Sequence, residues 1–95
     1  MAKAPEDKYY NNVMLAQSAD LLLTLKGIEC SFAIGYLEEG KVGISARSLG
    51  NINVQLIMEE LGGGGHLANA ATQIEGINLD EALERLNDAI DKILS

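Results

Sequence analysis

The sequence predicts an α/β (α+β) domain in which a small open mixed sheet of at least three strands, including a β-hairpin, is flanked by three helices. Three observations support this class. Apolar residues recur at helical spacing near both ends of the chain, two central segments alternate in polarity, and a glycine run separates a short helix in the second half from another strand-like segment. The order α, β, β, α, β, α is typical of an open sandwich of sheet and helices.

The first helix is expected between Tyr9 and Lys26, since this segment is rich in good helix formers and Gly27 is a suitable stop. Residues 1–8 are predicted to be a flexible lead-in or an artificial boundary, with a helix start near Glu6 or Asp7. A single domain is therefore expected over residues 9–95. The apolar surface of the helix is wide enough to need a covering layer, and it comprises Leu15, Ala19, Leu21, Leu22, Leu23 and Leu25.

A β-hairpin is expected between residues 29 and 47. Segments 29–37 and 42–47 both alternate in residue type, and the turn-like sequence Glu-Glu-Gly-Lys joins them. Because successive side chains of a strand point to opposite faces, Ser45 and Arg47 are expected opposite Val42 and Ile44.

The second half of the chain predicts a helix, a strand and a helix. Asn51 or Asn53 is a suitable cap for a helix that ends near Leu61, before the glycines at 62–65. A strand is expected within 67–74, most clearly over 71–74. The last helix has Asn78 as its cap and Glu81 three residues later. Its inner face is predicted to comprise Leu79, Ala82, Leu83, Leu86, Ala89, Ile90 and Ile93.

The charge distribution restricts the partners. The 95 residues carry a net charge of −7, which argues against binding of long duplex nucleic acid through a broad basic face. Residues 41–74 nevertheless carry two basic and two acidic groups, and they hold six of the ten glycines. An anionic ligand is therefore least repelled in this middle third.

The sequence also indicates the compartment and the absence of a structural metal. No apolar run approaches the roughly 20 residues of a membrane-spanning helix, so we expect a cytoplasmic domain without direct membrane contact. The lone Cys30 cannot form an internal disulfide, and with His66 as the one histidine no zinc ligand set is expected. Cys30 is predicted to be a small buried apolar residue.

The run from Gly62 to Gly65 is the strongest local signal. Glycine costs roughly 0.5–1 kcal/mol relative to alanine within a helix or strand, so four in succession indicate backbone geometry that side chains would forbid. Such a run can direct several N–H groups at one anion, although a helix stop or a flexible loop is the simpler structural alternative. His66 follows directly and could donate to a phosphate oxygen or serve only as a structural hydrogen-bonding residue.

Arg47 is the second candidate. Ser45 precedes it at strand spacing and Ser48 follows it, so a guanidinium group and hydroxyls could converge on one phosphate. The alternative is a solvated charge at a strand end. No nucleophile elbow, Walker loop or Cys-x-x-Cys pair occurs, so catalytic residues and metal ligands are not expected in this chain. The acidic side chains of the last helix are predicted to be solvated, namely Asp80, Glu81, Glu84, Asp88 and Asp91.

The segment GISARSLGNINV, followed by GGGGH, resembles the DHH-associated domain of DHH-family phosphoesterases. The resemblance extends from about Gln17 to the C-terminus, and the pairing of an S-x-R strand end with G-G-G-H is more specific than either motif alone. The stretch GISARSLGNINVQLIMEELGGGGHLANAATQI is similar to the GdpP-type branch, the membrane-anchored cyclic-di-AMP phosphodiesterases. Leu67 also favours this branch, because oligoribonuclease-type relatives typically have a basic residue directly after the histidine.

The resemblance implies a parent enzyme that hydrolyses cyclic-di-AMP to linear di-adenylate with manganese held by a separate DHH domain. The present chain would then be a nucleotide-binding domain that is inactive alone, binds no cofactor itself, and belongs to a membrane-anchored parent. Its expected partners are the cyclic or linear nucleotide and the DHH domain of the same parent chain. The resemblance assigns substrate binding to Ser45, Arg47, Ser48, Asn51, Gly63, Gly64, Gly65, His66 and Asn69.

Two other functions stay open on the sequence. The wide apolar surface of the first helix would suit an interaction module, for instance a homodimer. An exonuclease-like relative would use the same fold to bind nucleic acid or short oligonucleotides. The acidic balance disfavours long nucleic acid, whereas a two-nucleotide ligand needs little positive charge.

Overall fold

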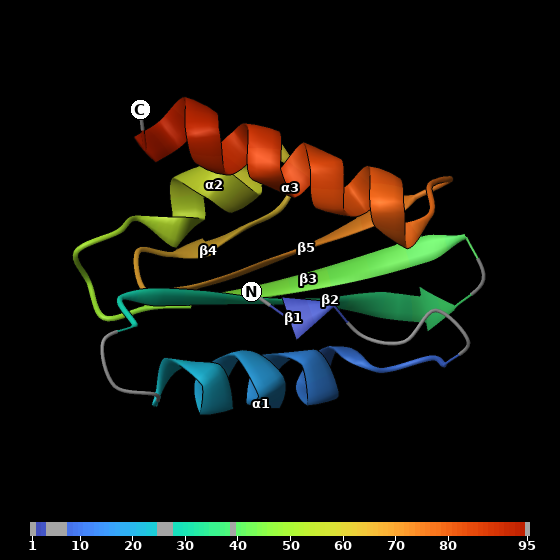
Figure 1. The fold of residues 1–95 in the computed structure, drawn as a ribbon, viewed down its shortest axis with the longest axis horizontal. Coiled ribbons are helices and arrows are strands. Elements are labelled where there is room, and N and C mark those ends of the chain that lie inside the picture. Colours follow the sequence, from blue (N-terminus) through green and yellow to red (C-terminus); the bar gives the residue numbers. More distant parts are fainter. Residues whose placement is uncertain (1, 4–7, 25–27, 39, 95) are drawn as a thin grey trace.

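The computed structural model describes residues 2–3, 8–24, 28–38 and 40–94. Its elements are β1 (Ala2–Lys3), α1 (Asn12–Leu23), β2 (Cys30–Glu38), β3 (Lys41–Ser48), α2 (Val54–Glu60), β4 (Gly64–His66), β5 (Asn69–Glu75) and α3 (Leu79–Leu94). The strands form one open sheet in the order β1-β2-β3-β5-β4. Helix α1 lies on one face of the sheet, and α2 and α3 lie on the other (Figure 1). The predicted fold class is confirmed.

The sheet is mixed, as predicted. Strand β1 pairs with β2 in parallel, with Ala2 opposite Ala33, and all other pairings are antiparallel. The hairpin of β2 and β3 has the expected alternation, with Ile34 opposite Ile44 and Ala33 opposite Ser45. Among the described residues, no helix combines the length and the apolar character that crossing a bilayer would require.

Helix α1 is shorter than the predicted segment. It begins at Asn12, because the Oδ1 atom of Asn11 accepts the N–H of Met14 at 2.8 Å and caps the first turn. Tyr9 lies outside the helix and forms an isolated parallel bridge with Tyr36 of β2. The prediction of helix from Tyr9 was wrong because pairing with the sheet overrides the local helical preference of this segment.

The C-terminal end of α1 is also earlier than the predicted one. The N–H of Thr24 donates to the carbonyl of Leu21 at 3.2 Å, which closes the last turn. Gly27 and Leu25, which the sequence assigns to the helix stop and the apolar face, lie outside the described residues, as do the predicted starts at Glu6 and Asp7.

The principal core fills the space between the sheet and the layer of α2 and α3. The predicted inner face of α3 is confirmed, and both helices direct apolar side chains onto β2, β3 and β5. The fully enclosed members of this core include Ile34, Val42, Ile44, Val54, Ile57, Met58, Leu79 and Leu86. Burial of this apolar surface is the main force that holds the two layers together.

A smaller cluster packs α1 against the opposite face. Leu15 and Ala19 of α1 contact Ala33 of β2. Small residues on the strands permit this close approach: a Cβ at Gly43 would lie 2.9 Å from the Leu15 and Leu37 side chains. Strands β2 and β3 are therefore buried on both faces.

Strand β4 was missed from the sequence, and β5 is longer than predicted. The β4 strand is three residues long and contains two glycines and a histidine, so it carries no alternating apolar pattern. Its strand geometry comes from pairing with β5, with Gly64 opposite Ala71 and His66 opposite Asn69. The two residues between the strands form a tight turn.

Helix α3 follows its predicted boundaries. The Oδ1 atom of Asn78 accepts the N–H of Glu81 at 2.8 Å, so Asn78 is the predicted N-cap. The buried positions Leu79, Ala82 and Leu86 recur at three- and four-residue intervals, which directs one face of the helix into the core.

We predict that Asn78→Ala lowers the free energy of unfolding by about 1 kcal/mol, because the Glu81 N–H loses its partner in the first turn. Asn87→Ala, at an exposed position in the interior of the same helix, is the matched control and should leave stability unchanged or slightly higher. Urea unfolding monitored by circular dichroism measures both. Equal effects of the two substitutions would contradict the capping role.

Candidate functional site

The strand register brings three of the predicted site residues into one row. Arg47 of β3 lies opposite Asn69 of β5, and Asn69 lies opposite His66 of β4. Directly opposed residues of antiparallel strands project from the same face of a sheet. The row therefore runs across three strands, and its ends are about 10 Å apart because neighbouring strands are about 4.8 Å apart.

A second row of small residues lies beside the first on the same face. Ser45 is opposite Ala71, and Ala71 is opposite Gly64. The Ser45 side chain is buried at 3% exposure, whereas Ala71 is exposed. The polar row is thus bordered by a nearly flat floor with no large side chain.

Helix α1 covers only part of this face. It packs on β2 and β3, where the strand residues are buried. On β5 the residues of the same face, Asn69, Ala71 and Gln73, are exposed, and so is His66 on β4. We call this uncovered area over β5 and β4 the open half-face. Arg47 lies at its border with α1.

Arg47 is held by two hydrogen bonds. Its Nε donates to Oδ1 of Asp20 at 2.7 Å, and its Nη1 donates to the carbonyl of Ala46 at 2.9 Å. The Arg47 side chain is 13% exposed and the Asp20 side chain 60% exposed. A guanidinium has five N–H donors, so three remain after these two contacts. The arginine is ordered by its own domain and can still bind an anion.

Sequence reasoning missed Asp20. The residue is separated from Arg47 by 27 positions, and only the packing of α1 on the sheet brings the two together. One sequence signal was present, because Asp20 is the one charged residue in the α1 segment.

The glycine run has two structural roles, at the end of α2 and in the pairing of β4 with β5. Gly62 has a φ of +84° and its N–H donates to Glu59 O, while the Gly63 N–H donates to Met58 O at 2.8 Å. These two bonds form a Schellman motif that ends α2. Gly63 and Gly65 then lie against β5: an added Cβ would be 2.2 Å from the Ala71 carbonyl oxygen and 2.5 Å from the Asn69 carbonyl oxygen, respectively.

Gly64 differs from its neighbours. Its φ is one that any residue adopts, and an added Cβ would meet no atom within 4 Å. Gly64 lies opposite Ala71, so that Cβ would project onto the open half-face. The fold therefore explains glycine at 62, 63 and 65 but does not require it at 64.

The turn between β4 and β5 is held by backbone hydrogen bonds to two other segments of the chain. The carbonyl of Leu67 accepts the N–H of Val54, and the carbonyl of Ala68 accepts the N–H of Ser48, both at 3.0 Å. These bonds tie the turn to the start of α2 and to the end of β3. They hold His66 and Asn69, which flank the turn, in line with Arg47.

Two of the polar site residues predicted from the sequence lie outside both rows. Ser48 is buried on the opposite face from Arg47, and its Oγ accepts the N–H of Gly50 at 2.9 Å. Asn51 is exposed in the segment between β3 and α2. The α2 cap is Asn53, whose side chain accepts the N–H of Leu56 at 3.3 Å.

Other features named from the sequence lie away from the row. The acidic residues of α3 are exposed, as predicted, and the described residues contain no group of three or more His, Cys, Asp or Glu that could hold a metal ion. Cys30 is half-buried against the principal core, and burial raises the pKa of its thiol. On α1, Val13, Met14 and Leu21 are exposed, so the proposal of a docking or homodimer surface there stays a prediction.

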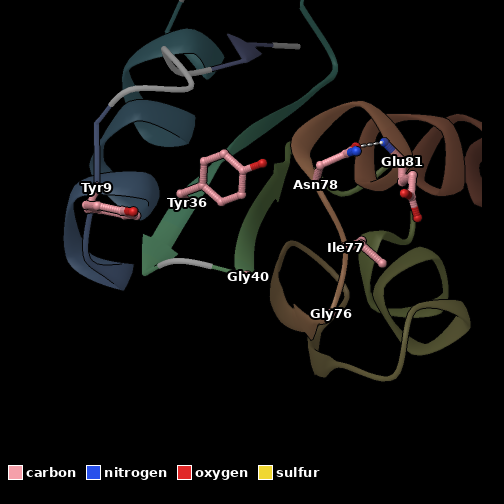
Figure 2. A pocket seen from close by; sticks show the side chains of 7 residues that line it. All are labelled: Tyr9, Tyr36, Gly40, Gly76, Ile77, Asn78 and Glu81. Carbon is pink, nitrogen blue, oxygen red and sulfur yellow. Dashed lines mark hydrogen bonds between the residues drawn. The ribbon is translucent and has the colours of Figure 1, made fainter.

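A cavity of about 640 Å³ lies at the other end of β3, beside the turn that contains Gly40. Figure 2 shows Tyr36 and Asn78 on its walls. Two N–H groups at the start of α3 are already bonded, since Leu79 donates to the Tyr36 hydroxyl and Glu81 to Asn78. The Glu81 carboxylate also lies on the wall of the cavity and would repel an anion. The cavity is therefore a poorer anion site than the open half-face.

Comparison with known proteins identifies the family. The model of the DHHA1 domain matches residues 2–94. The chain belongs to the DHHA1 domain family. The resemblance expected from the S-x-R and G-G-G-H motifs is thereby confirmed.

Two curated relatives are close to this DHHA1 domain. It is 58% identical over 87 residues to the cyclic-di-AMP phosphodiesterase GdpP of Bacillus subtilis (strain 168) and 50% identical over 91 residues to the cyclic-di-AMP phosphodiesterase PdeA of Listeria monocytogenes serotype 1/2a (strain 10403S). The matches cover 92% and 96% of this chain but 13% and 14% of the relatives. The domain therefore corresponds to a small part of each of these larger proteins.

A solved structure shares the fold. The crystal structure of an exopolyphosphatase-related protein from Bacteroides fragilis superposes with a TM-score of 0.73 at 24% identity, over 87% of this chain and 24% of that one. The arrangement of helices around the sheet is thus found within a larger protein.

We predict that Gly63→Ala lowers the free energy of unfolding by about 2 kcal/mol, because the Ala71 carbonyl would have to move and the β4–β5 pairing would be strained. Gly64→Ala is the matched control, and we expect a change below about 0.5 kcal/mol because its Cβ meets no atom. Urea unfolding of the two variants measures the difference. A Gly64→Ala variant as unstable as Gly63→Ala would refute this assignment of the glycine run.

Proposed function

We propose that this DHHA1 domain is the nucleotide-binding domain of a DHH-family phosphodiesterase that hydrolyses cyclic-di-AMP to linear di-adenylate. The observation that carries the proposal is the row of Arg47, Asn69 and His66 along one border of an open, nearly flat half-face. The names of the GdpP and PdeA relatives support the choice of substrate.

Each member of the row has a chemical role in this proposal. Arg47 binds a phosphate through the donors that Asp20 and Ala46 leave unused, since guanidinium groups match phosphate oxygens in bidentate geometry. Asn69 and His66 donate to further phosphate or ribose oxygens along the row. Ser45 lies on the same face but is buried where α1 packs on β3, so its contribution is to support the strand beside Arg47.

The small floor beside the row accommodates the rest of the nucleotide. Ala71 and Gly64 form this part of the half-face, and neither carries a side chain larger than a methyl group. A sugar or a base can therefore approach the backbone there. This close approach explains why glycine is present at 64 although the fold does not require it.

Catalysis in this proposal needs groups from the remainder of the parent chain. In the full enzyme we expect manganese, held by a DHH domain, to activate the attacking hydroxide. The DHHA1 domain contributes by binding and orienting the substrate, which lowers the entropic part of the barrier. We therefore expect the isolated domain to bind nucleotide without hydrolysing it.

The test is a titration of isotope-labelled domain with linear di-adenylate, with sulfate as a charge control. We expect saturable shifts of the amide signals of Arg47, Gly64, His66 and Asn69 that exceed those caused by sulfate. Shifts confined to other surfaces, or no saturable shift, would refute the proposal.

We predict that Arg47→Ala weakens binding of linear di-adenylate by about 1.5–3 kcal/mol, because charge-assisted hydrogen bonds to phosphate are lost. Arg85→Ala is the matched control, since Arg85 is the other arginine and lies exposed on α3. Isothermal titration calorimetry measures the affinity of both variants. Equal affinities would show that Arg47 is an ordinary surface charge.

We also predict that Gly64→Val weakens binding at least about tenfold while the domain stays folded, because the side chain rises from the floor where the nucleotide approaches. The same calorimetric titration measures the loss, and circular dichroism verifies the fold. A folded Gly64→Val variant with the affinity of the wild type would place the nucleotide elsewhere.

A further inference from the structure

Asp20 of α1 forms an ion pair with Arg47 of β3. We propose that Asp20 is a positioning residue: it holds the Arg47 guanidinium so that the edge formed by Nη1 and Nη2 is presented to a phosphate on the open half-face. The inference rests on the proposed nucleotide-binding function and adds a residue from α1 to that site.

The geometry of the guanidinium supports this role. Asp20 accepts from Nε at 2.7 Å and Ala46 accepts from Nη1 at 2.9 Å. Because the guanidinium group is planar, two hydrogen bonds at different nitrogen atoms define the orientation of the whole group. Nη2 and the second hydrogen of Nη1 remain, and together they form the paired donor edge that matches two oxygens of a phosphate.

The exposure of the two side chains indicates that the ion pair affects the orientation of Arg47 more than the folding stability of the domain. Arg47 is 13% exposed and packed at the border of α1, whereas Asp20 is 60% exposed. Ion pairs with a partner this exposed contribute little to folding stability. The pair therefore has its main effect on the orientation of Arg47, and removal of the Asp20 carboxylate should leave the domain folded.

Two effects of Asp20 on an anionic ligand have opposite signs. Its negative charge repels a phosphate, so its removal would strengthen binding if charge alone mattered. Its hydrogen bond orders a long side chain with many rotamers, so its removal would weaken binding. Because the Asp20 carboxylate is mostly in water, salt and solvent screen the repulsion, and the loss of order should dominate.

The experiment measures the affinity of the isolated domain for linear di-adenylate by calorimetry. Asp20→Ala should weaken binding by about three- to tenfold. Asp20→Glu keeps a carboxylate and should restore the affinity to within about twofold of the wild type. Asp88→Ala removes one negative charge from an exposed position on α3 and serves as the matched control, with unchanged affinity expected.

A spectroscopic measurement reports on orientation directly. In the ligand-free wild type the Nε–H of Arg47 should give a distinct, slowly exchanging proton signal because it donates to a carboxylate. The signal should be lost in Asp20→Ala and recovered in Asp20→Glu. Loss of this signal together with the loss of affinity in Asp20→Ala, and recovery of both in Asp20→Glu, would assign the positioning of Arg47 to the Asp20 carboxylate.

The outcomes distinguish this inference from the proposed function. If the wild type fails to bind linear di-adenylate, the proposed function is refuted and the inference is refuted with it. If the wild type binds and Arg47→Ala does not, but Asp20→Ala binds as well as the wild type or better, only the positioning role of Asp20 is refuted. Persistence of the Arg47 Nε–H signal in Asp20→Ala would refute it as well.

Discussion

The antiparallel register between β3 and β5 is the constraint on which the core and the candidate site both depend. It sets Ile44 opposite Thr72 on the face of α2 and α3, and Arg47 opposite Asn69 on the face of α1. A shift of one residue would turn every side chain of β5 to the other face. Such a shift would expose Ala70 and Ile74 and would bury Asn69 without a partner, so the hydrophobic core and the site stabilise the same register.

The glycine run shows how a short segment satisfies several requirements in succession. Gly62 ends α2, Gly63 and Gly65 allow β4 to lie closely against β5, and Gly64 leaves the open half-face flat. Since the turn after His66 is tied to β3 and α2 through backbone hydrogen bonds, the site is built on rigid elements and not on a free loop.

The attraction of the domain for an anion depends on the charges near the site and not on its net charge. A net charge of −7 would discourage anion binding if charge acted uniformly over the surface, but screening limits exposed charges to a range of about 8–10 Å. The acidic residues of α3 lie on the layer opposite the open half-face (Figure 1). A single ordered arginine can therefore attract a phosphate in an acidic protein, and the carboxylate beside it serves to orient that arginine.

The sequence by itself determined the three helices, the central hairpin and the placement of Arg47 and Val42 on opposite faces of the sheet. Helix caps, glycine stops and hydrophobic periodicity are local signals, so they can be read without the tertiary structure. The family motifs also indicated Arg47, His66 and the glycines as site residues. Strand β4, the start of α1 and the pairing of Asp20 with Arg47 were decided only by the tertiary structure. These three features depend on which strands become neighbours and on how α1 packs across them. Strand order and helix packing are fixed by burial and hydrogen bonding between segments that are far apart in the chain.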